Sequence, residues 1–162
     1  MLALLLSTCL VQPADVLVQP KDGHFAIRFP GKPKENTQSV KTELGTLKVY
    51  TATYALPDGS IYLASFTEFP ADAVKPDFRG TFFDGAVSGL KGKDGKVVSE
   101  MKIEIGKDKI EGREVLIDKG KQQTRYRMVV KENRLIQIGL VGIGEFATGK
   151  DATAFLDSFK LK

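Results

Sequence analysis

Alternation of apolar and polar residues is the feature that most restricts the fold of this chain. In the segment His24-Phe25-Ala26-Ile27-Arg28-Phe29, every second residue is large and apolar, which is the pattern of a half-buried strand. Pro30 and Pro33 follow, and because proline lacks a backbone N–H they end that strand in an extended turn. The same alternation recurs along most of the chain. We expect strands over residues 24–29, 37–44, 47–56, 60–68, 97–105, 109–118, 122–130 and 135–141.

Two segments follow the helical period instead. Residues 78–90 place Phe78, Phe82 and Phe83 on one side of a helix, and residues 151–159 form a shorter amphipathic pattern. Asp77 is a candidate cap for the first helix, and Asp151 or Thr148 for the second. The order strands, helix, strands, helix lacks the β-α-β alternation of a parallel sheet. We therefore predict an α+β fold, in which an antiparallel β-sheet is flanked by helices.

The N-terminal residues have the character of an export signal. Residues 1–14 contain an apolar run without charge, too short for a bilayer span of about 20 residues but suited to a signal peptide. We expect residues 1–19 to be a leader, residues 20–162 to be a single domain, and the protein to be exported to the periplasm or cell envelope. Cys9, in Leu6-Ser7-Thr8-Cys9, resembles the lipobox cysteine of bacterial lipoproteins. Lipidation there would attach the protein to a membrane. Free secretion and an unstructured or packed N-terminal tail are the alternatives.

Three short motifs resemble those of the PsbP-like superfamily. They are Phe25-x-Ile27-x-Phe29-Pro30-Gly31-x-Pro33, Phe82-Phe83-Asp84-Gly85-Ala86 and Ala154-Phe155-Leu156-Asp157-Ser158-Phe159. The resemblance implies an α/β/α sandwich and a binding or accessory role, without catalysis, as in the exported bacterial proteins and lipoproteins of unknown function in that superfamily. Its photosynthetic members use histidines and carboxylates for metals or docking. This chain has only His24, so we do not expect a photosystem role.

Motifs typical of enzymes are incomplete. Residues 144–150 match the G-x-x-x-x-G-K of a phosphate-binding loop, but Asp151 replaces the Ser or Thr that would bind magnesium. Ser88 and Lys91 match Ser-x-x-Lys without the partner motifs of the enzymes that use it. His24 is the only imidazole available to a catalytic triad. We expect no catalytic residues, no cofactor and no metal site, and a single cysteine excludes an internal disulfide.

Arg125 and Arg127 are the candidate partner-binding residues. Both fall on the face of their strand opposite Tyr126 and Met128, so we expect their charged groups to reach solvent and to mark a docking platform. The alternative is cross-strand pairing with glutamates. The net charge of +4 comes from scattered lysines and arginines, which predicts no nucleic-acid partner. The identity of a protein partner and the oligomeric state stay open.

These features predict a non-enzymatic exported accessory or protein-binding domain of the bacterial cell envelope. The alternative is a small-molecule or lipid carrier, which would need an apolar pocket behind the helix that carries Phe78, Phe82 and Phe83.

Overall fold

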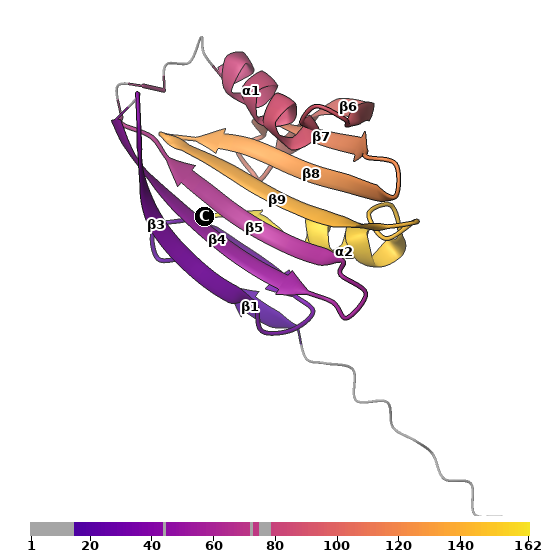
Figure 1. Ribbon diagram of the computed structural model, residues 1–162. Coiled ribbons are helices and arrows are strands. Elements are labelled where there is room, and N and C mark those ends of the chain that lie inside the picture. The colour runs from indigo at the N-terminus through magenta and orange to yellow at the C-terminus, as the bar shows by residue number, and fades with distance from the viewer. Residues whose placement is uncertain (1–14, 44, 72, 75–78) are drawn as a thin grey trace, which may run out of the picture.

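The larger of two sheets in the computed structural model contains seven strands, and every neighbouring pair is antiparallel (Figure 1). The structure describes residues 15–43, 45–71, 73–74 and 79–162. The strand order is β3-β4-β5-β9-β8-β7-β6, so the two halves of the chain meet where β5 pairs with β9. The strands are β3 (Lys34–Thr42), β4 (Gly45–Ala55), β5 (Ile61–Glu68), β6 (Lys96–Ile105), β7 (Ile110–Asp118), β8 (Gln122–Lys131) and β9 (Arg134–Ile143).

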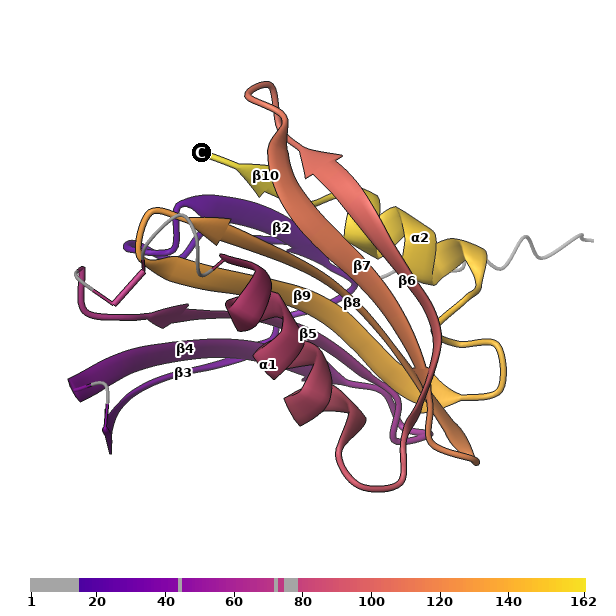
Figure 2. The same ribbon diagram turned by 90° about the horizontal axis from the view of Figure 1, so that it is seen from above.

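Two further layers cover the faces of this sheet. Helix α1 (Arg79–Lys91) lies on one face, and helix α2 (Lys150–Asp157) lies on the other (Figure 2). A small antiparallel sheet shares the layer of α2, with the order β1 (Val16–Val18), β2 (Phe25–Phe29) and β10 (Lys160–Leu161). The predicted α+β class with an antiparallel sheet between helices is confirmed, and the small sheet is an addition to it.

Strand β2 carries the centre of the core between the small sheet and the large one. Phe25, Ile27 and Phe29 are fully buried, as their alternation predicts. The ring of Phe29 packs edge-on against Phe155 of α2, with 5.2 Å between the ring centroids. The turn that follows places Gly31 against the ring of Tyr54, where a Cβ atom would lie only 2.5 Å from the nearest ring carbon. The Pro-Gly-x-Pro turn therefore needs a glycine at position 31, because a side chain there would collide with Tyr54.

Helix α1 is held to the opposite face of the large sheet by its phenylalanines. Phe83 is 2% exposed and belongs to a cluster with Val115, Tyr126 and Met128 of the sheet. Phe82 is only partly buried and packs against Phe69, at 4.9 Å between ring centroids. The expected helix face is confirmed for these residues, while Phe78 and the candidate cap Asp77 lie outside the described residues.

Local differences from the expectations have simple causes. Strands β1 and β10 are too short to show alternation, and β1 lies inside the segment 1–19 that we expected to be a leader. Because β1 pairs with β2 and buries Val18, the folded domain begins before residue 20. The N-cap of α2 is Gly149 and no side chain makes a capping hydrogen bond there, so neither Thr148 nor Asp151 caps the helix. Thr148 bonds instead to the carbonyl of Glu145.

Candidate functional site

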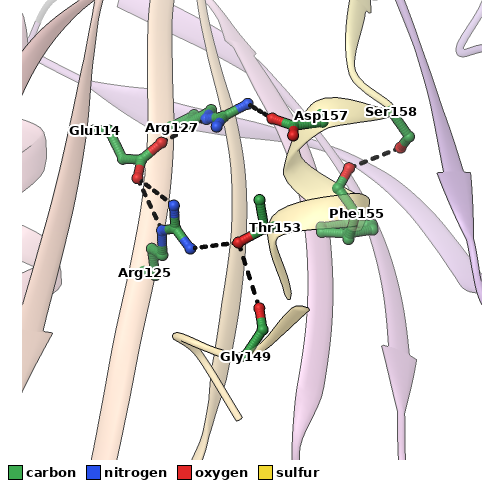
Figure 3. A network of polar contacts seen from close by, with 8 residues as sticks. All are labelled: Glu114, Arg125, Arg127, Gly149, Thr153, Phe155, Asp157 and Ser158. Carbon is green, nitrogen blue, oxygen red and sulfur yellow. Dashed lines mark hydrogen bonds and ion pairs between the residues drawn. The ribbon is translucent and has the colours of Figure 1, made fainter. Parts of the chain in front are cut away.

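Arg125 and Arg127 project from β8 toward α2 and meet the carboxylate of Glu114 on β7 (Figure 3). Arg125 donates to one oxygen of Glu114 from Nε at 2.8 Å and from Nη2 at 2.6 Å. Arg127 donates from Nε to the other oxygen at 2.5 Å. Each arginine also reaches α2: Arg125 bonds to Thr153 at 3.2 Å and Arg127 to Asp157 at 2.8 Å. The two arginines thus connect β7, β8 and α2.

The burial of this network differs from the exposed face that we expected for Arg125 and Arg127. The side chains of Arg125 and Arg127 are 17% and 21% exposed, and that of Glu114 is 7% exposed. Our expectation that both guanidinium groups reach solvent is wrong, because α2 covers this part of the sheet face. The alternative, cross-strand pairing with a glutamate, is confirmed. Burial alone would lower the pKa of Arg127, but its hydrogen bonds to Glu114 and Asp157 raise that pKa above the ordinary value, so the group stays charged.

The other residues singled out from the sequence do not assemble into one site. Residues 144–149 form the turn before α2 and Lys150 begins the helix, with Gly144 at a φ of 58° and Gly149 as the N-cap. Ser88 and Lys91 lie on the exposed side of α1. His24 faces Glu132, with Nδ1 3.8 Å from the nearest carboxylate oxygen. Cys9 lies outside the described residues.

Phe83 occupies the position where a carrier would need a cavity. Its ring belongs to one buried cluster with Val115, Tyr126 and Met128, so these side chains lie between this part of α1 and the sheet. Within the part of the chain that the structure describes, no three His, Cys, Asp or Glu side chains are grouped so that they could hold a metal ion. Among the same residues, neither helix has the length and apolarity needed to cross a membrane.

Lysines gather at the end of the molecule where β10 lies beside β2. We call this group the lysine-rich end: Lys21, Lys107, Lys131, Lys160 and Lys162. They line two neighbouring pockets of about 410 and 350 Å³, and Lys162 contributes to both. Asp108 is the one acidic side chain among the described residues that line these pockets. The result is a concentrated positive surface at one end of the fold.

Backbone pairing brings these lysines together from distant parts of the sequence. Strand β10 pairs with β2, with Lys160 opposite Ala26, and the amide of Lys162 donates to the carbonyl of His24 at 2.9 Å. The turn between β6 and β7 supplies Lys107, and in Figure 2 this hairpin extends close to β10. Sequence reasoning missed the cluster, because it treated the lysines as scattered and did not predict β10.

Two of the lysines have partners and three do not. Lys131 donates to the backbone carbonyl of Lys162, and the ammonium of Lys162 donates to Gln19 at 2.5 Å. The described structure gives Lys21, Lys107 and Lys160 no ion pair or side-chain hydrogen bond. These three ammonium groups are exposed and available to an anionic partner.

No family model and no curated protein matches the sequence. Among solved structures, it is similar to cyanobacterial PsbP (CyanoP) from Synechocystis sp. PCC 6803, with a TM-score of 0.57 over 93% of this chain and 94% of the other. The chain has the PsbP-like fold. The sequence identity is 12%, so this likeness concerns the fold alone.

A weaker likeness to a second solved structure adds nothing to the assignment of the PsbP-like fold. This structure is PA94 from Pseudomonas aeruginosa, described as a protein of unknown function and a putative regulator. The TM-score is 0.43 at 7% identity, over 88% of this chain and 92% of the other. The resemblance expected from the three sequence motifs is confirmed by CyanoP at the level of the PsbP-like fold.

Proposed function

We propose that this chain is a non-enzymatic accessory domain that docks an acidic protein partner through its lysine-rich end. The observation that carries the proposal is the set of three exposed lysines without an ion pair, Lys21, Lys107 and Lys160, around two pockets whose described lining includes one acidic side chain, that of Asp108. Charge complementarity of this kind steers association and selects the partner. The docking role first assigned to Arg125 and Arg127 moves to these lysines, because the arginines are engaged with Glu114.

We place this role on the exported side of the cell, where the first residues of the chain would direct the protein. The position of β1 is compatible with a membrane anchor at Cys9. Val16 pairs with Phe29, at the end of β2 opposite to His24 and Lys162. A tether that enters at Val16 would therefore leave the lysine-rich end at the other end of β2, open to a protein partner.

The test is capture of partners from the envelope fraction of the source organism, with immobilised wild-type protein and two triple variants. The first variant is K21Q/K107Q/K160Q. The matched control is K41Q/K96Q/K121Q, which removes the same charge from exposed lysines elsewhere. Exposed charges contribute only about 0–1 kcal/mol to folding, so both variants should unfold within about 1 kcal/mol of wild type.

The proposal expects the first variant to lose a partner that the control retains, and expects wild-type capture to weaken between low and high salt. Equal capture by the two variants would place the interface elsewhere. Turnover of a substrate by the purified protein would contradict the non-enzymatic part of the proposal.

A further inference from the structure

The larger pocket of the lysine-rich end combines an apolar lining with charged groups. Docking of a flat acidic surface would not require the apolar lining. The pocket is about 410 Å³ in volume and lies between β10 and the β6–β7 hairpin. Its apolar lining comes from Ile105 and Ile110 at the two ends of the hairpin turn and from Phe159 and Leu161 beside it. Its size falls within the range of small-molecule sites, about 300–1,000 Å³.

The charged part of the pocket consists of ammonium groups around this apolar lining and of one carboxylate, that of Asp108, so positive charge is in excess. Lys107 comes from the hairpin turn, Lys131 from the end of β8, and Lys160 from β10. Lys107 and Lys160 have no ion pair, while Lys131 is turned to the carbonyl of Lys162. Lysine is a compact, strongly hydrated charge that gives up its water only to a strong acceptor such as an oxyanion.

A ligand in this pocket must contact both the apolar lining and the ammonium groups. A bare inorganic anion would meet the lysines but would gain nothing from Phe159 and Leu161. An uncharged apolar group would fill the lining but leave the two free ammonium groups without a partner. We infer that the pocket between β10 and the β6–β7 hairpin binds a carboxylate joined to an apolar group.

Two sources supply that chemistry: the C-terminal residue of a peptide with an apolar side chain, and a free fatty acid. In both, the apolar group lies against Ile110 and Leu161, and the carboxylate accepts hydrogen bonds from Lys107 and Lys160. The inference goes beyond the proposed function and shares with it only the lysine-rich end, so a defined ligand can test it without any partner.

The experiment titrates the full chain with three probes and follows backbone amide shifts by NMR. The probes are an acetylated peptide that ends in Leu-Leu with a free carboxylate, the same peptide with an amidated C-terminus, and octanoate. Saturable shifts at Gly106, Ile110 and Leu161 are expected with the acid peptide or with octanoate, and whichever binds identifies the source. The amidated peptide should bind roughly tenfold more weakly or not at all.

Variants then separate the two parts of the pocket. K107Q/K160Q should weaken the acid probe roughly tenfold, while K96Q/K121Q should leave its affinity unchanged. Leu161→Thr should weaken binding without a change in charge. Because Leu161 also packs on the core, a thermal melt of that variant accompanies the titration.

Absence of saturable shifts with both carboxylates, or equal binding of the acid and amidated peptides, overturns the inference. Shifts that map outside the pocket also overturn it. None of these results bears on partner capture, which tests the proposed function separately.

Discussion

Glu114 lies at the centre of the polar network that links α2 to the sheet. It accepts three hydrogen bonds from Arg125 and Arg127, and those two guanidinium groups continue to Thr153 and Asp157 of α2. The pair of positive charges is tolerated at low exposure because one buried carboxylate lies between them.

We predict that Glu114→Gln lowers the free energy of unfolding by about 3 kcal/mol, because the neutral amide leaves two partly buried guanidinium groups without their shared counter-charge. Urea denaturation measures the loss. The control is Glu111→Gln, which removes an exposed carboxylate 3.6 Å from Lys102 and should cost less than about 1 kcal/mol. Equal costs at the two positions would show that the network contributes little to stability.

Tyr126 gives the protein a sensitivity to alkaline pH. Burial raises the pKa of its hydroxyl from 10.0 to about 12, so the folded state holds a proton that the unfolded chain releases at lower pH. The stability that this group contributes is fully present below pH 10 and is lost as the pH rises from 10 to about 12.

We predict that the free energy of unfolding falls across this pH interval and falls less in Tyr126→Phe. The difference should be on the order of 2 kcal/mol, since each unit of pKa shift corresponds to about 1.4 kcal/mol. Denaturant melts from pH 8 to 12 provide the measurement. Parallel pH profiles for the two proteins would mean that other groups, such as Tyr50 and Tyr62, whose pKa values are also raised, account for the loss.

At the scale of elements, helix α1 is stabilised by packing although its sequence has a low intrinsic helix propensity. Gly80, Gly85 and Gly89 each disfavour a helix by about 1 kcal/mol relative to alanine. In the structure these glycines have no heavy atom near a would-be Cβ, so they lie on the open side of the helix. What holds α1 is Phe83 beneath it, assisted by Arg113, whose guanidinium lies 5.2 Å from the Phe83 ring and bonds to Asp84.

We predict that Phe83→Ala costs about 3–5 kcal/mol, because it removes buried apolar surface and leaves a cavity. Phe82→Ala should cost clearly less, since Phe82 is only partly buried against Phe69. The sequence alone does not separate these adjacent rings, whereas the structure ranks them. Chemical denaturation of both variants is the test, and a larger loss for Phe82 would mean that the orientation of α1 is wrong.

The elements also show where sequence reasoning succeeds and where it stops. Alternation identified the long strands, because a half-buried strand imposes a period of two on its residues. Strands β1 and β10 have three and two residues, too few for any period, and their pairing with β2 is set by tertiary contacts. Alternation also placed Arg125 and Arg127 on the correct face of β8. It could not show that α2 covers that face, because which layer covers a strand is not encoded in the strand.

At the scale of the whole molecule, β2 joins the two ends of the described chain. It pairs with β1 on one side and with β10 on the other, and all three lie over the core of the large sheet. The lysine-rich end exists because of this arrangement, since Lys21 follows β1 and Lys160 and Lys162 belong to or follow β10. The surface that we propose for recognition therefore forms only when the chain folds, and it cannot be recognised in the linear sequence.

The same arrangement predicts how far the N-terminus can be shortened. A chain that starts at residue 15 keeps β1, whereas one that starts at residue 20 loses the three residue pairs of β1 with β2 and the side chain of Val18, which is 5% exposed. We predict that residues 15–162 unfold in urea like the full chain, and that residues 20–162 are less stable by about 2–4 kcal/mol. Equal midpoints and slopes for the two shortened chains would show that β1 contributes nothing to the fold, and would restore the domain boundary first placed at residue 20.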